Sequence, residues 1–256
     1  MTKMRRVGAR VQGTFIDAMS WGAAVERIAG WATRRESRYV CLTNVHSVVT
    51  ASQDKRFAAA LDGADLALPD GMPVAWQLRR AGFVGQPRLS GPDLMWRYCA
   101  HAARAGQSIF LYGSTPPVLA ALTSKLQTAF PALRIAGTYA PPFRAEVALE
   151  EPEVLERINR SGAGAAFVGL GCPKQELWMQ RHREHLRAVL LGVGAAFDYH
   201  AGTVKRAPRW AQRTGVEWAF RFAAEPRRLW RRYLTSNSRF ILRSIVPRSS
   251  TNPGSR

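Results

Sequence analysis

Short apolar stretches alternate with longer stretches of helical character along most of this chain. The stretches with the length and composition of buried strands are residues 39–45, 108–112, 133–137, 165–169 and 188–193. Helices are expected over residues 48–61, 116–130, 152–160 and 173–185, with Thr115 as the N-cap of the second. This alternation is typical of a parallel sheet covered by helices. We therefore predict an α/β fold, a Rossmann-like parallel sheet with helices on both faces; an α+β domain with a mixed sheet is the less favoured alternative.

The net charge restricts the partners of the protein. The chain has 256 residues, of which 46% are apolar, so it is neither disordered nor fibrous. It carries 37 Lys and Arg against 18 Asp and Glu, a net charge of +19. Residues 205–256 alone hold 13 basic and 2 acidic groups. Such an excess predicts an anionic partner, namely nucleic acid, anionic lipid or a phosphorylated substrate.

The basic C-terminal region differs from the rest of the chain because it has no strand pattern and interleaves aromatic residues with arginines. We divide the chain into an α/β domain (residues 1–211), a basic amphipathic helical appendage (residues 212–250) and a disordered tail (residues 251–256). The appendage suits an anionic membrane surface best. Packing on the domain comes second, and binding of single-stranded nucleic acid third.

The remaining sequence features favour a cytoplasmic protein. The chain has three cysteines with no close pair, which excludes a disulfide framework and a zinc ribbon and fits a reducing compartment. No apolar stretch approaches the length of a membrane-spanning helix, and the basic N-terminus is not followed by the apolar region of a signal peptide.

Polar and glycine-rich clusters follow several expected strands, where ligands of open parallel sheets bind. They occupy residues 43–46, 68–73, 88–93, 113–115, 169–176 and 192–198. The clusters at 113–115 and 169–176 precede helices and could offer N–H groups to a phosphate. Asp70, between Pro69 and Gly71, fits a general base and a turn or N-cap residue equally well. Asp93 is more consistent with helix capping.

Several kinds of site find little support. The dinucleotide fingerprint is incomplete, because Gly169-x-Gly171 lacks the third glycine and Gly192-x-Gly194 is followed by Phe197. The sequence has no Asp-x-Asp, no cluster with metal-ligand spacing and no Gly-x-Ser-x-Gly. A nicotinamide oxidoreductase and a non-catalytic nucleic-acid-binding module remain as alternatives. If the protein handles phosphates, arginine and lysine are expected to neutralise them without a metal or other cofactor.

The clusters also form an ordered set of motifs. They are Asn44-Val-His, Pro69-Asp70-Gly71, Arg88-x-x-Gly91, Gly171-x-Pro173-Lys-Gln175-Glu176, Gly194-Ala-Ala-Phe197-Asp198, Gly202-x-x-x-Arg206-Ala-Pro208 and Glu217-Trp218…Arg221…Glu225-Pro226-x-Arg228…Arg232-Tyr233. In this order they resemble the WecG/TagA/CpsF glycosyltransferase family, over most of the chain.

The resemblance implies an inverting, metal-independent transferase that moves a sugar from a UDP-sugar donor to a polyprenyl-diphosphate-linked saccharide. It also implies a location at the inner face of the cytoplasmic membrane, docked through the C-terminal appendage, and possible trimers. No nucleic acid and no cofactor are expected. The forms of the Pro-Asp-Gly and Glu-Pro motifs favour exopolysaccharide assembly over teichoic acid synthesis.

The resemblance also assigns site residues. Asp70 matches the catalytic base that takes the proton of the acceptor hydroxyl. Asn44 and Gln175 match positions that line the donor or acceptor pocket, and Arg88 matches another site position. Some members have Thr two residues before the motif Asn; here that residue is Leu42, so Thr43 is included as the adjacent polar group. The arginines expected to face a diphosphate are Arg221, Arg228 and Arg232.

Overall fold

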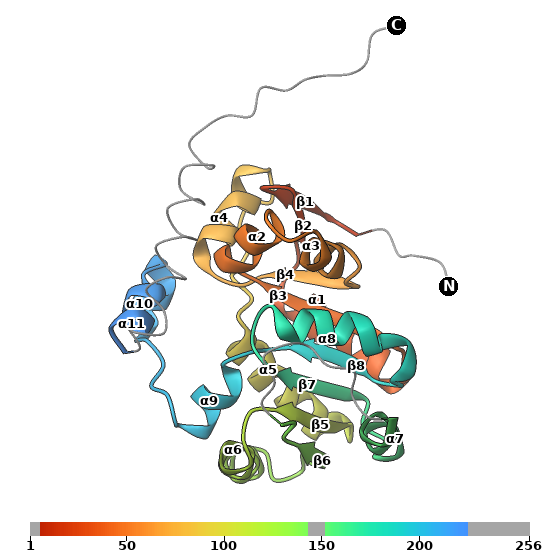
Figure 1. Ribbon diagram of the computed structural model, residues 1–256. Helices are drawn as coiled ribbons and strands as arrows, with labels where there is room; N and C mark the ends of the chain where they lie inside the picture. Colours follow the sequence, from red (N-terminus) through yellow and green to blue (C-terminus); the bar gives the residue numbers. More distant parts are fainter. Residues whose placement is uncertain (1–5, 143–151, 225–256) are drawn as a thin grey trace, which may run out of the picture.

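The computed structural model describes residues 6–142 and 152–224 and has a single parallel sheet at its centre (Figure 1). Its six strands lie in the order β4-β3-β8-β7-β5-β6, and every neighbouring pair is parallel. The strands are β3 (Arg38–Thr43), β4 (Leu66–Pro69), β5 (Ser108–Gly113), β6 (Arg134–Tyr139), β7 (Ala165–Gly169) and β8 (Val189–Gly192). The predicted α/β class is confirmed. Numbered along the chain these strands read 2-1-6-5-3-4, whereas dinucleotide-binding sheets read 3-2-1-4-5-6.

Helices cover both faces of the sheet, as predicted. They are α1 (Trp21–Thr33), α2 (Val45–Ala51), α3 (Lys55–Asp62), α4 (Met72–Arg80), α5 (Gly91–Ala105), α6 (Pro116–Ala129), α7 (Pro152–Arg160), α8 (Lys174–His182), α9 (Ala196–Ala201), α10 (Arg209–Thr214) and α11 (Glu217–Ala224). Alternate residues of a strand point to opposite faces. In β3, Val40 and Leu42 therefore join the core beneath α1, α5, α6 and α9, while Tyr39 and Cys41 join the core beneath α3, α7 and α8.

Two predicted helices have different boundaries in the structure. The helix expected over residues 48–61 is two helices, α2 and α3. Asp54 separates them, because its extended backbone and its side chain, which accepts from the N–H groups of Arg56 and Phe57, start a new helix. The helix expected to reach residue 185 ends at His182 and continues as a 3₁₀ turn, Arg183–His185.

An antiparallel hairpin at the N-terminus, absent from the prediction, lies beside β4. Its strands are β1 (Gly8–Val11) and β2 (Thr14–Asp17), joined by a turn with positive φ at Gln12 and Gly13. The buried Asp17 carboxylate accepts hydrogen bonds from Arg6 and from the N–H of Ala67 in β4. The hairpin thus satisfies a donor on the edge strand of the main sheet.

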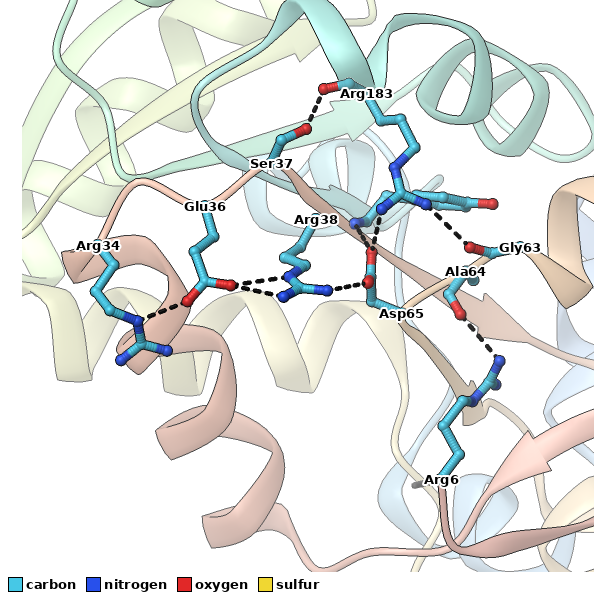
Figure 2. A network of polar contacts seen from close by, with 10 residues as sticks. Arg6, Arg34, Glu36, Ser37, Arg38, Gly63, Ala64, Asp65 and Arg183 are labelled. Carbon is cyan, nitrogen blue, oxygen red and sulfur yellow. Dashed lines mark hydrogen bonds and ion pairs between the residues drawn. The ribbon is translucent and has the colours of Figure 1, made fainter. Parts of the chain in front are cut away.

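A network of ion pairs ties together the amino ends of β3 and β4 (Figure 2). Asp65 accepts from Arg38 Nη1 at 2.8 Å and from the backbone N–H of Tyr39 at 3.0 Å, and it pairs with Arg183 at 3.5 Å. Glu36 contacts Arg38 from the other side at 2.8 Å. The side chain of Asp65 is only 11% exposed. The network lies at the amino ends of the strands, whereas the strand-end motifs lie at their carboxyl ends.

We expect Asp65→Ala to lower the free energy of unfolding by about 3 kcal/mol, because it removes one acceptor from each of two arginines and the side-chain acceptor of the Tyr39 N–H. Urea denaturation measures the change. Asp62→Ala is the matched control, since Asp62 is half exposed and its only ion pair among the described residues, with Arg10, is 3.8 Å long; its effect should stay below about 0.5 kcal/mol. Equal stabilities of the two variants would contradict this role for the network.

Candidate active site

The carboxyl ends of β3, β4, β7 and β8 open into a cavity of about 1310 Å³. Typical small-molecule sites occupy roughly 300–1,000 Å³, so this cavity is large enough for more than one ligand. Its lining includes the predicted site residues Asn44, Asp70, Arg88 and Gln175. Four motif residues that are distant in the sequence therefore share one cavity.

Asp70 stands on the turn between β4 and α4. Its backbone N–H donates to the carbonyl oxygen of Thr43 at 2.9 Å, which fixes the turn against β3. The N-cap position of α4 is Gly71, with φ of 96°, and no side chain caps that helix. Because Gly71 takes a conformation that other residues rarely adopt, the chain can turn sharply here. Asp70 is thus not the N-cap of α4, and its half-buried side chain lines the cavity.

Asn44 starts α2 directly after β3. Its Oδ1 accepts hydrogen bonds from the N–H and the hydroxyl of Ser47, at 3.2 and 3.3 Å. Asn44 is therefore an N-cap residue as well as part of the cavity lining. With its carbonyl oxygen engaged by the helix, the amide NH₂ is the group left for a ligand.

Gln175 projects from the first turn of α8 and is 4% exposed. Its Nε2 donates to Oε1 of Glu176 at 2.9 Å, which fixes the orientation of the amide. Its Oε1 is buried and has no hydrogen-bond partner among the described residues. An unsatisfied buried acceptor at a cavity calls for a donor from a ligand, such as a hydroxyl or an amide N–H.

Arg88 connects the α/β domain to the C-terminal helices. It is 10% exposed, pairs with Glu217 of α11 at 3.0 Å, and donates to the carbonyl oxygen of Gln212 in α10 at 3.2 Å. Residues 214–218, between and within these helices, line the cavity together with Gln212. Arg88 therefore holds one side of the cavity in place and borders the space itself. The predicted boundary between residues 211 and 212 falls inside α10.

Comparison with known proteins identifies the family to which the chain belongs. The model of the glycosyl transferase WecG/TagA/CpsF family matches residues 9–253, nearly the whole chain. The chain belongs to the WecG/TagA/CpsF family of glycosyltransferases. A curated relative from Bacillus spizizenii is 33% identical over 204 residues, which cover 79% of this chain and 77% of the relative. It is named N-acetylglucosaminyldiphosphoundecaprenol N-acetyl-beta-D-mannosaminyltransferase.

Family membership makes this cavity the candidate active site of a glycosyltransferase. It decides against the two alternatives, the nicotinamide oxidoreductase and the non-catalytic nucleic-acid-binding module. Among residues 6–142 and 152–224, no group of three His, Cys, Asp or Glu side chains could hold a metal ion. None of the helices in those ranges is long and apolar enough to cross a membrane.

Not every predicted site residue of the glycosyltransferase reaches the cavity. Thr43 is fully buried in β3 and does not line the cavity, and its hydroxyl has no hydrogen-bond partner in the described part of the chain. Leu42 lines the cavity instead. Arg221 belongs to α11, but its side chain is not described. Arg228, Arg232 and the predicted tail lie outside the described residues.

The glycosyltransferase also has cavity residues to which the sequence assigned no role. Asp198 of α9 lines the cavity, and its backbone carbonyl oxygen accepts the N–H groups of residues 202–204. Asp198 belongs to the Gly194-Ala-Ala-Phe197-Asp198 motif, so the sequence did contain a signal that could have pointed to it. The residues Trp76, Arg79 and Arg80 of α4 also line the cavity, and they lie in no strand-end cluster.

The expected phosphate-binding turn at residues 113–115 is only partly supported. Thr115 does take the N-cap position of α6, as predicted, and Ser114 lines the cavity. However, the first two residues of α6, Pro116 and Pro117, have no N–H group. The start of this helix therefore offers fewer donors to a phosphate than the glycine pattern suggested.

Asp93 does not cap α5, contrary to the expectation. Ser90 holds the N-cap position, and Asp93, in the first turn, accepts from the Ser90 hydroxyl at 2.5 Å. Asp93 also forms a two-pronged ion pair with Arg206, at 2.6 and 2.8 Å. Burial alone would raise the pKa of Asp93, but the hydrogen bonds and charge of Arg206 lower it to about 2. The pair fastens the segment before α10 to the α/β domain.

The lowered pKa gives a pH dependence. The pKa of Asp93 is lower in the folded state than its ordinary value of 3.8, so its ionised carboxylate stabilises the protein at pH values above 3.8. That contribution is lost as the pH falls through the folded-state pKa of about 2. We expect Asp93→Asn to lower the stability by about 1 kcal/mol at pH 7, since the carboxylate is partly exposed. Thermal unfolding from pH 7 to pH 3 should show wild type and variant converging below pH 4. A constant difference over this range would contradict the ion-pair explanation.

Proposed function

We propose that this glycosyltransferase transfers a sugar from a UDP-sugar to a saccharide linked to polyprenyl diphosphate, with inversion and without a metal ion. The observation that carries the proposal is the position of Asp70. This carboxylate lines a cavity that is large enough for two substrates and that also contains Arg88 and the α4 arginines. The name of the Bacillus spizizenii relative, which acts on a diphosphoundecaprenol-linked sugar, supports the class of acceptor.

In the proposed reaction, Asp70 takes the proton of an acceptor hydroxyl while that oxygen attacks C1 of the donor sugar. The bond between C1 and the diphosphate oxygen breaks, and UDP leaves with the bonding electron pair. Attack on the side opposite to UDP inverts the configuration at C1. Arginines stabilise the charge that develops on the diphosphate. We also assign Arg221, Arg228 and Arg232 of the C-terminal region to contacts with the donor diphosphate or the lipid diphosphate, as the family resemblance implies.

For the donor sugar we propose N-acetylmannosamine, because the relative is named for its transfer. The preference for exopolysaccharide assembly rests on two short motifs and receives no support from this relative, so it is not carried further. The Oε1 of Gln175, which has no hydrogen-bond partner within residues 6–142 and 152–224, is compatible with an acetamido sugar, because an acetamido N–H could donate to it.

A panel of UDP-sugars tests the reaction. The purified protein is incubated with each donor and with N-acetylglucosaminyl-diphosphopolyprenol, and the lipid product is analysed by mass and by the NMR coupling at the new anomeric centre. We expect one disaccharide lipid, formed fastest from UDP-N-acetylmannosamine, with the configuration at C1 opposite to that of the donor. A product with retained configuration would contradict the direct role of Asp70.

We also propose that the enzyme binds the inner face of the cytoplasmic membrane through its C-terminal region, where it could assemble as a trimer. Within the described part, Trp218, Phe220 and Phe222 of α11 are 44%, 38% and 37% exposed. Aromatic residues next to arginines favour the headgroup region of anionic membranes. Co-sedimentation with anionic vesicles, compared between wild type and Phe222→Ser, tests the attachment, and light scattering tests the trimer.

A further inference from the structure

Helix α4 forms a distinct border of the active-site cavity. Three of its residues, Trp76, Arg79 and Arg80, line the cavity and are exposed to solvent. In Figure 1, α10 and α11 lie near α4, at the left of the view. The contact is close, because a Cβ atom added to Gly215, at the end of α10, would lie 3.0 Å from the Trp76 ring. The cavity thus has a border made by α4 and the C-terminal helices.

The two arginines of this border have no acidic partner in the described part of the chain. Arg79 donates from Nε to the carbonyl oxygen of Gln86 at 3.0 Å, which orients its guanidinium group. Arg80 forms no ion pair with any described residue. Glu217, the nearby acid of α11, is already paired with Arg88. Two positive charges therefore face the cavity, and neither forms an ion pair with a described residue.

The opposite border has a different chemistry. It is made by the turns after β7 and β8, where residues 169–172 and 192–196 bring backbone and small side chains to the cavity. Such turns allow close approach of a nucleotide diphosphate to the backbone. Asp70 immediately precedes the Gly71 cap of α4, so the proposed base lies next to the arginine-bearing helix. A base must reach the acceptor hydroxyl, and the acceptor therefore belongs on the α4 side.

We infer that α4 carries the subsite for the diphosphate of the lipid-linked acceptor. Arg79 and Arg80 bind the diphosphate oxygens, and Trp76 packs against the apolar face of the first sugar or the start of the isoprenoid chain. Guanidinium groups suit phosphate oxygens because they offer several N–H donors in a fixed plane. The donor diphosphate then occupies the border made by the turns after β7 and β8. This assignment rests on the proposed function and adds the place of the acceptor within the site.

The test compares the full-length wild type with Arg80→Ala and with Arg79→Ala/Arg80→Ala, using short-chain acceptors in detergent without vesicles. We expect KM for N-acetylglucosaminyl-diphosphoprenol to rise about tenfold in the single variant and further in the double variant. The affinity for UDP, measured by calorimetry, should change less than twofold. Arg56→Ala is the matched control, because Arg56 is an exposed arginine of α3 that does not line the cavity; it should behave as wild type.

Comparison with an acceptor that has only one phosphate sharpens the test. Wild type should prefer the diphosphate acceptor, and the double variant should lose most of that preference. If UDP affinity falls instead, the arginines serve the donor and the inference is wrong. If the defect is absent in detergent and appears only when anionic vesicles are added to the assay, the arginines bind lipid headgroups and the inference is equally wrong. Failure of the proposed function itself is distinguishable, because the wild type would then transfer no sugar to either acceptor.

Discussion

Replacing Asp70 by Asn is expected to lower kcat for sugar transfer by about 10²–10⁴-fold, the range in which general bases contribute. Asn has the size of Asp but cannot accept the proton of the acceptor hydroxyl. The backbone hydrogen bond from residue 70 to Thr43 does not involve the side chain, and Asp70 does not cap α4, so the fold should persist. Initial rates, circular dichroism and UDP titration measure the three properties separately.

A second carboxylate in the cavity supplies the control for this experiment. Asp198 lines the same cavity, and the glycosyltransferase should retain considerably more activity in Asp198→Asn than in Asp70→Asn. A larger loss in Asp198→Asn would transfer the role of base to that residue. Activity of Asp70→Asn within threefold of wild type would exclude Asp70 as the base.

Arg88→Ala is expected to reduce kcat/KM by about 10–100-fold, because it weakens the attachment of the C-terminal helices α10 and α11 to the α/β domain. Its guanidinium is the only described group paired with Glu217, and it also binds the carbonyl oxygen of Gln212. Removing one partner of a largely buried ion pair leaves the other charge without compensation, at a cost of roughly 3–5 kcal/mol in fully buried cases. α10 and α11 should therefore separate more readily from the domain. Limited proteolysis within residues 207–224 measures that separation.

Two further variants distinguish this positioning role from direct substrate binding. Glu217→Gln removes the ion pair but keeps Arg88, so it should show part of the activity loss and part of the increased proteolysis. Arg88→Lys keeps the charge but cannot reach both partners with one planar group, so it should rescue the activity only partly. Wild-type behaviour of Glu217→Gln would show that the ion pair with Glu217 does not account for the effect of Arg88→Ala.

Much of the fold was predictable because the central strands are short, apolar and bounded by turn residues. β7 has the bounds expected from the sequence, and so does α7. The single helix expected over residues 48–61 was wrong, because both halves are helical and only the capping geometry of Asp54 separates them. The β1–β2 hairpin and α1 precede the repeating strand–turn–helix pattern on which the prediction relied, and for that reason they were not predicted.

The site was predictable to the extent that strand ends of a parallel sheet converge. Asn44, Asp70 and Gln175 meet for that reason. Thr43 does not, because adjacent strand residues point to opposite faces and Leu42 is the one that reaches the cavity. The ion pair between Arg88 and Glu217 joins residues far apart in the sequence, so no local pattern could reveal it. The arginines of α4 lie on a helix face, and only the three-dimensional arrangement brings them to the cavity.

The most direct test of the proposed function is sugar transfer in EDTA. Purified protein is incubated with labelled UDP-sugars and a polyprenyl-diphosphate-linked N-acetylglucosamine, and the label in the lipid phase is counted. We expect label from UDP-N-acetylmannosamine, an unchanged rate when EDTA replaces a divalent metal, and loss of the label in Asp70→Asn. No label from any donor, with the acceptor verified on a control enzyme, would contradict the proposed reaction. Label that appears only after a metal ion is restored would contradict the metal-independent mechanism.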